Sequence, residues 1–173
     1  MLVRIIGMAL AFGAAALAGI YCGNVDGYRV KDLADMKKAL AILKSEIEFA
    51  HTPLPEALVS IGERMGGPVG GMFLMLSQRL GKARGTDAAT LWEECVRHFA
   101  PQTYFNKEDT AQVIAFGRVL GYLDKGMQMA NIAITADYIT EKMAQINETR
   151  LKNKRMFQSL GVLGGLLVVI IFL

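Results

Sequence analysis

The chain has 173 residues, of which 53% are hydrophobic, and it carries 19 Lys and Arg against 16 Asp and Glu. Its charges are unevenly distributed, because Arg4 is the only charged residue before Asp26 and none follows Arg155. Ends without charge around a charged middle are typical of a membrane-anchored protein, which argues against a plain cytosolic enzyme. The net charge of +3, with acids interleaved among the bases, also argues against a nucleic-acid-binding protein.

Residues 1–22 are apolar apart from Arg4 and predict an N-terminal transmembrane helix, since about 20 helical residues cross the hydrocarbon core of a bilayer. A cleaved signal peptide is the alternative, because Arg4, the apolar stretch and Ala16–Ala18 imitate its parts. A lipoprotein site at Cys22 is a weaker alternative, because Tyr21 is large for the position before the cysteine.

Residues 23–155 predict a helical bundle domain, because they show hardly any strand-like alternation. Over Val30–Ala50, apolar residues recur in steps of three and four, as on one face of a helix. Proline and glycine separate the later helices. These are a second helix over Leu54–Met65, a third ending near Gly81, a fourth capped by Thr86 or Asp87, a fifth capped by Asn106 with Asp109, and a sixth from about Lys125.

Residues 156–173 predict a C-terminal transmembrane helix into which the sixth helix can run without interruption. Basic residues such as Lys31 and Lys152 flank both apolar segments on the side of the middle region, which the positive-inside tendency places in the cytoplasm. A cleaved signal would export the middle and put the second basic flank on the wrong side. The predicted fold class is therefore all-α: a compact bundle of about six helices between two terminal transmembrane helices.

Contacts between these helices are open to two interpretations. The first and sixth helices pack as antiparallel neighbours within one bundle, or they form an intermolecular coiled coil in a homo-oligomer. Small residues at helical spacing in the apolar segments would let two helix backbones approach closely in the membrane. These candidate packing residues are Gly7, Ala11, Ala15, Gly19, Gly161 and Gly165.

No pattern for catalysis or for a cofactor occurs in the sequence. His51 and His98 have no ligand spacing around them, and Cys22 and Cys95 make no CxxC pair, so we expect no metal site. Residues 81–86 combine glycine with basic side chains but lack the GxxxxGK[ST] string of a phosphate-binding loop. We therefore expect a protein that is not an enzyme and holds no cofactor.

Several short strings occur together in this chain. Residues 44–47 (KSEI) are followed by residues 52–58 (TPLPEAL), by Trp92, by residues 116–128 (FGxxLGxxDxxxQ) and by residues 160–166 (LGxLGGL). This combination resembles the stage III sporulation protein AB family over nearly the whole chain, and the string at 116–128 is its most distinctive part. The first strings are also similar to the cytoplasmic domains of F-type platform proteins of type II secretion and type IV pilus systems.

The resemblance implies a structural platform component of the secretion-like channel between mother cell and forespore in endospore-forming bacteria. Its stems would lie in the outer forespore membrane, in contact with lipid, and its helical domain would face the mother-cell cytoplasm. The partners that it implies are a secretion-type ATPase, stage III sporulation protein AA, and other channel subunits. The alternatives are an F-type platform component of a secretion or pilus system and an exported, membrane-tethered protein. F-type proteins have two such domains and more membrane helices. Their mode of assembly is therefore expected to apply to this chain only in part.

Gly121, Asp124 and Gln128 lie in the most distinctive string, where the fifth helix is expected to give way to the sixth. In one interpretation they form a helix-turn-helix corner, with Asp124 as the cap of the sixth helix. In the other interpretation the corner is the surface that docks a partner, because it lies far from both stems in chain order.

Overall fold

The computed structural model of the chain describes residues 2–50, 53–82, 87–118, 120 and 125–172. These residues form six α-helices, a π-helical turn and a 3₁₀-helical turn, and no strand occurs among them. The all-α prediction is therefore confirmed. In chain order the elements are α1 (Leu2–Ser45), η1 (Glu46–Ala50, π-helix), α2 (Leu54–Met65), α3 (Gly67–Lys82), α4 (Ala88–Phe99), η2 (Ala100–Gln102, 3₁₀-helix), α5 (Lys107–Gly117) and α6 (Lys125–Phe172).

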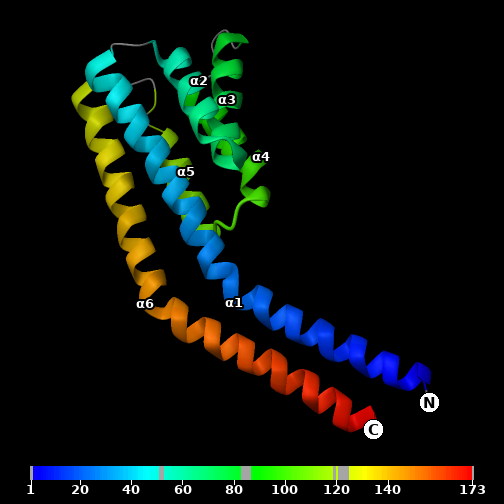
Figure 1. The fold of residues 1–173 in the computed structure, drawn as a ribbon. Coiled ribbons are helices and arrows are strands. Elements are labelled where there is room, and N and C mark those ends of the chain that lie inside the picture. The colour runs from blue at the N-terminus through cyan, green and yellow to red at the C-terminus, as the bar shows by residue number, and fades with distance from the viewer. Residues whose placement is uncertain (1, 51–52, 83–86, 119, 121–124, 173) are drawn as a thin grey trace. The chain divides into compact units, whose positions relative to one another are not determined.

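The chain divides into two compact units. The terminal unit consists of Met1–Val30 and Ala144–Leu173, and the central unit consists of Lys31–Met143. Both division points fall inside long helices, so α1 and α6 each contribute one part to each unit (Figure 1).

The expected start of the first helix near Val30 is wrong, because α1 already begins at Leu2. Gly23 and Gly27 do not interrupt it. A β-carbon at Gly23 would lie 3.2 Å from a carbonyl oxygen of α6, so this glycine permits close packing within the terminal unit. The sixth helix likewise runs without a break from Lys125 to Phe172.

Among the described residues, no helix is both long enough and apolar enough to be identified as a membrane span. The transmembrane helices expected over 1–22 and 156–173 are therefore not found as separate elements. These residues instead belong to the ends of α1 and α6, which have 44 and 48 residues and carry charged side chains along their other parts.

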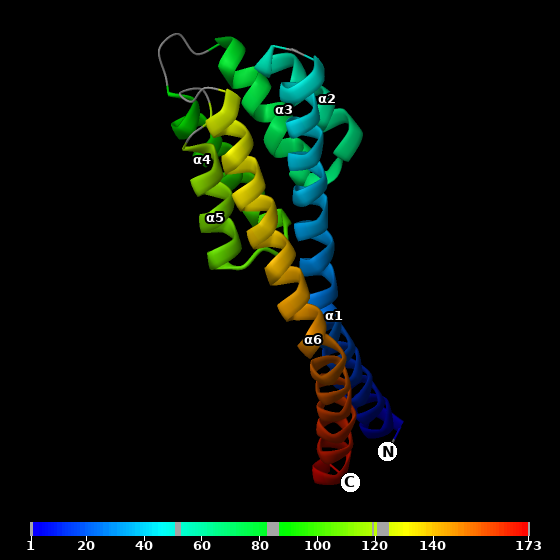
Figure 2. The same cartoon turned by 90° about the vertical axis from the view of Figure 1, so that its left-hand side faces the viewer.

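Helices α2 and α3 form a hairpin in the central unit and lie side by side in both views (Figures 1 and 2). Gly66 and Gly67 make the turn with φ angles of 61° and 56°, in the left-handed region that favours glycine. Beside the turn the two backbones meet at Gly62 and Gly70. A β-carbon on Gly70 would lie 2.7 Å from the carbonyl oxygen of Gly62, so the hairpin closes only with glycine there.

The core of the central unit surrounds Trp92, the single tryptophan of the chain. Its side chain is fully buried, and its ring centroid lies 5.1 Å from that of Phe73 and 5.8 Å from that of Phe116. The indole Nε1 donates a hydrogen bond of 2.6 Å to the carbonyl oxygen of Val113, which satisfies the one polar atom of the ring. Further fully buried residues come from α1, α2 and α3: Leu33, Leu40, Leu43, Leu58, Ile61, Met72 and Leu76.

The starts of α4 and α5 follow their sequence signals. The carboxylate of Asp87 accepts a hydrogen bond of 3.3 Å from the backbone N–H of Ala89. Asn106 and Asp109 form the expected capping box, because Asn106 Oδ1 accepts from Asp109 N at 2.8 Å and Asp109 Oδ2 accepts from Asn106 N at 3.0 Å. The fully buried carboxylate of Asp109 is thus occupied in holding a helix end.

Gly117 is the position in α5 at which a side chain would be least tolerated. A β-carbon there would overlap the indole ring of Trp92 at Cδ1, whereas a β-carbon at Gly81, near the end of α3, would meet nothing within 4 Å. We expect Gly117→Ala to lower the free energy of unfolding by about 3 kcal/mol, because the core would be overpacked. We expect Gly81→Ala to raise it by about 0.5–1 kcal/mol through helix propensity.

Urea unfolding of the full chain in detergent, followed by Trp92 fluorescence, measures both changes in the central unit. Equal midpoints for the two alanine variants would contradict the packing of α5 against Trp92.

Candidate functional site

The first candidate site is the corner expected around residues 121–128. Gly121 and Asp124 lie outside the described residues. Gln128 lies in the second turn of α6 and is half-buried.

Asn131, one turn further along α6, was not anticipated from the sequence. Its Nδ2 donates a hydrogen bond of 3.0 Å to the carbonyl oxygen of Phe116. This carbonyl lies in the last turn of α5, where backbone acceptors lack partners within their own helix. The link fastens α6 to the end of α5, so the described side of the corner is held firmly in place.

A second link joins the beginning of α6 to the end of α1. The Nζ atom of Lys125 donates a hydrogen bond of 2.9 Å to the carbonyl oxygen of Glu48, which lies in the π-helical turn η1. A π-helical turn closes wider hydrogen-bonded rings than an α-helix and is frequent at functional sites. The lysine supplies a donor to the end of this helix, as cationic side chains do at helix C-termini.

The second candidate site is the pairing of α1 with α6 inside the terminal unit, where these two helix ends lie side by side (Figures 1 and 2). Gly19 and Gly161 are in contact: a β-carbon at Gly19 would lie 2.9 Å from Cα of Gly161. A β-carbon at Gly161 would also lie 2.9 Å from the carbonyl oxygen of Ala15, and one at Gly165 would lie 2.8 Å from the ring of Phe12.

Not every residue of the predicted packing set lies at this contact. Gly7 is exposed, and a β-carbon there would meet nothing within 4 Å. The side chain of Ala11 lies outside the described part of the chain. A polar contact accompanies the glycines, because Asn153 Nδ2 donates a hydrogen bond of 3.2 Å to Asp26 Oδ2. The close contact thus runs along Ala15, Gly19, Gly23, Gly161 and Gly165.

Burial changes the titration of two groups in the central unit. The Asp32 carboxylate accepts a hydrogen bond of 2.7 Å from the backbone N–H of Tyr104, yet its pKa is raised from the ordinary value of 3.8, first by burial and then by the nearby Asp35. Burial raises the pKa of the Cys95 thiol to about 11. At neutral pH Cys95 is therefore a protonated, fully buried thiol and a poor nucleophile.

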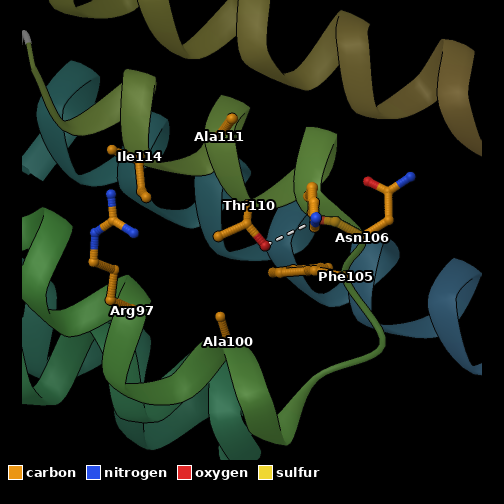
Figure 3. A pocket seen from close by; sticks show the side chains of 8 residues that line it. Arg97, Ala100, Phe105, Asn106, Thr110, Ala111 and Ile114 are labelled. Carbon is orange, nitrogen blue, oxygen red and sulfur yellow. Dashed lines mark hydrogen bonds between the residues drawn. The ribbon is translucent and has the colours of Figure 1, made fainter.

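The third candidate site is an open groove between the end of α4 with η2 and the start of α5 (Figure 3). It has a volume of about 340 Å³, which falls at the lower end of the roughly 300–1,000 Å³ of ligand sites. The hydroxyl of Thr110 donates a hydrogen bond of 2.9 Å to the carbonyl oxygen of Asn106 at its wall. Its lining residues are Arg97, Ala100, Phe105, Asn106, Lys107, Thr110, Ala111 and Ile114.

No group of three His, Cys, Asp or Glu side chains among the described residues could hold a metal ion. The ion pairs named next are instead surface contacts, two between helices and one within a helix. Lys142 Nζ lies 2.8 Å from Glu108, Arg97 lies 2.7 Å from Glu93, and Arg79 contacts Glu94. Pairs with this much exposure contribute little to stability.

The elements and contacts described above define an all-helical protein with an aromatic core and a glycine-lined helix pair. A family model for stage III sporulation protein AB matches residues 4–173. The stage III sporulation protein AB of Bacillus subtilis (strain 168) is 27% identical over 173 residues, covering 99% of this chain and 100% of that protein. A solved structure of a stage III sporulation protein AB is similar with a TM-score of 0.65 at 25% identity, and the match covers 72% of this chain and 97% of that chain.

The chain belongs to the stage III sporulation protein AB family. This membership implies a role in sporulation, and it confirms the resemblance seen in the sequence strings.

The contact between Gly19 and Gly161 predicts how the terminal unit responds to larger side chains. Gly161→Leu should separate α1 from α6, because its β-carbon would lie 2.9 Å from backbone atoms of α1. Gly164→Leu should leave the pair intact, because a β-carbon there meets nothing within 4 Å. The measurement is disulfide cross-linking of the purified full chain between cysteines placed at Asp26 and Asn153 in a cysteine-free background. A cross-link that survives Gly161→Leu at full yield would contradict the observed helix pairing.

The environment of Asp32 predicts a pH-dependent stability. Because its pKa is raised in the folded state, the contribution of this group to stability is present at low pH and is lost as the pH rises through the folded pKa. Asp32→Asn keeps an oxygen that accepts from the backbone N–H of Tyr104 and removes the half-buried charge, so at pH 7 the variant should be at least as stable as the native chain. Unfolding midpoints at a series of pH values check this. The difference in unfolding midpoint between the variant and the native chain should shrink toward acidic pH. A native chain whose midpoint exceeds that of the variant by an amount that grows with pH would contradict a raised pKa of Asp32.

Proposed function

We propose that this chain is a membrane-anchored, non-enzymatic platform component of the channel between mother cell and forespore. In this proposal the apolar ends of the terminal unit, residues 1–22 and 156–173, are embedded in the outer forespore membrane, and residues 23–155 face the mother-cell cytoplasm. The observation that carries the proposal is the family match over residues 4–173, together with the structural division into a terminal and a central unit.

Exposed apolar side chains on the terminal unit support the membrane placement. Large apolar surfaces exposed to water are unfavourable and mark contacts with lipid or with another protein. The charged residues that flank the two ends, such as Arg29 and Lys152, lie toward the middle of the chain, as expected for a cytoplasmic middle region. The exposed apolar residues of this unit include Leu10, Leu17, Ile20, Leu160, Leu163, Leu166, Leu167 and Ile170.

The way polar groups are used in the central unit supports a scaffold rather than an enzyme. The buried carboxylate of Asp109 holds the start of α5, and Asp32 accepts from the backbone of Tyr104. The thiol of Cys95 is protonated at neutral pH because its pKa is about 11. These groups stabilise helix ends or fill the core, whereas a catalytic group requires a pKa matched to its task and access to a substrate.

In the same proposal a secretion-type ATPase, stage III sporulation protein AA, docks at the corner that contains Gln128. The links from Asn131 to Phe116 and from Lys125 to Glu48 support this choice, because they hold the start of α6 against α5 and α1. A surface that is held rigid before binding loses little conformational entropy when a partner docks. Other channel subunits are further partners in this proposal.

The docking role predicts a separation between stability and function at Gln128. Gln128→Ala should leave the urea midpoint of Trp92 fluorescence almost unchanged, and it should lower both the spore yield and the amount of ATPase recovered with the tagged full chain from sporulating cells. The matched control is Gln112→Ala, because Gln112 is also a half-buried glutamine but lies on α5. This variant should leave both the spore yield and the recovered ATPase unchanged. Spore yields that follow only the stability of each variant would refute the docking role of the corner.

A further inference from the structure

The groove between α4–η2 and α5 differs from the core below it in being open while having apolar residues in its lining (Figure 3). Phe105 and Ala111 are accessible, and Ile114 is buried at the inner side. A lining of this kind can receive one or two apolar side chains of a ligand. The walls are fixed, because the Asn106–Asp109 capping box and the hydrogen bond from Thr110 hold the first turn of α5.

The ionisable side chains that line the groove are basic, although the carboxylate of Glu93 lies beside one of them. Among the described residues, the lining contains two ionisable side chains, those of Arg97 and Lys107, and no carboxylate. The guanidinium of Arg97 contacts Glu93 at 2.7 Å on one side, but its side chain remains 67% exposed and can accept a second anion. Lys107 is exposed, and no carboxylate of the described residues pairs with it.

We propose that this groove binds an acidic peptide segment of a partner protein, with an apolar side chain of the segment against Phe105, Ala111 and Ile114. Carboxylates on either side of that apolar side chain would meet Arg97 and Lys107. This arrangement follows the usual division of an interface, in which apolar anchors supply affinity and charges at the rim supply orientation and partner choice. The inference deepens the proposed scaffold role and rests on it, since it names the chemistry of one docked partner.

Thr110 adds a polar contact for such a segment. Its hydroxyl hydrogen is directed to the carbonyl oxygen of Asn106, so the lone pairs of the hydroxyl oxygen remain as acceptors for a peptide N–H. The open form of the groove also fits an extended segment that crosses it better than a small molecule, which would need to be enclosed over most of its surface.

The experiment is a fluorescence anisotropy titration of the full chain in detergent micelles with two labelled peptides. One peptide has aspartates on both sides of a central phenylalanine, and the other has lysines in place of the aspartates. The acidic peptide should bind at least about tenfold more tightly than the basic one, and added salt should weaken the binding of the acidic peptide. Equal binding of the two peptides, or binding equal to that of empty micelles, overturns the proposal.

Variants of the groove separate binding from folding. The double variant Arg97→Glu with Lys107→Glu should bind the acidic peptide at least about tenfold more weakly than the native chain does. The matched control is Lys38→Glu with Lys44→Glu, at two exposed lysines of α1, and it should bind as the native chain does.

Ala111→Trp should block the groove because Ala111 is exposed in its wall, whereas Ala133→Trp, at an exposed alanine of α6, should not. Urea midpoints followed by circular dichroism at helical wavelengths show whether each variant is folded, because the two tryptophan variants add a second fluorophore to Trp92.

Each outcome bears on a different claim. Undiminished binding in folded Arg97→Glu/Lys107→Glu and Ala111→Trp overturns the groove as the site. Self-association of the native chain that these variants abolish, without peptide binding, also overturns the proposal, because the occupant is then a second copy. Failure of the peptide titration while the ATPase is still recovered from cells refutes the groove proposal alone. Normal sporulation of cells that lack the whole chain, together with no ATPase recovered with the tagged native chain, refutes the scaffold role itself.

Discussion

Close approach between helices at positions without a β-carbon is the constraint on which both units of this protein depend. In the central unit Gly117 lets α5 lie against the ring of Trp92, and Gly62 and Gly70 let α2 and α3 cross next to their turn. In the terminal unit Gly19 meets Gly161. Protein interiors are packed so tightly that a single additional methyl group at such a contact must displace a neighbour.

This constraint gives a physical meaning to the string at residues 116–128. Its first two residues complete the packing around Trp92: Phe116 contributes a ring and Gly117 contributes the space for the indole. The carbonyl of Phe116 is then taken by Asn131 of α6, so the same two residues connect the core to the next helix. The beginning of the string thus serves stability, whereas Gln128 at its end is half-buried on α6.

The polar residues of the central unit divide in the same way into buried groups that hold the fold and exposed groups at its surface. Asp109 and Asn106 satisfy each other at the start of α5, so that helix begins at a fixed place beside the groove. Arg97 and Lys107 are held at the groove by the helices that carry them and remain exposed. A scaffold of this kind positions surface groups through buried contacts, and the surface groups themselves contribute little to its stability.

The sequence by itself determined the helical class, the breaks at Pro53 and Gly66, the capping box of Asn106 with Asp109, and the inward face of α1 with Leu33, Leu40 and Leu43. These features depend on neighbours within a few residues, so helical periodicity and turn chemistry are sufficient to predict them. Only the tertiary structure decided that Gly23 lies within a continuous helix and that Asn131 binds the carbonyl of Phe116. It alone brought Asp32 to Tyr104, which is 72 residues away, and placed Arg97 and Lys107 on one groove. Contacts between distant segments depend on how whole helices pack, and no local pattern in the chain specifies which side chain will meet which carbonyl.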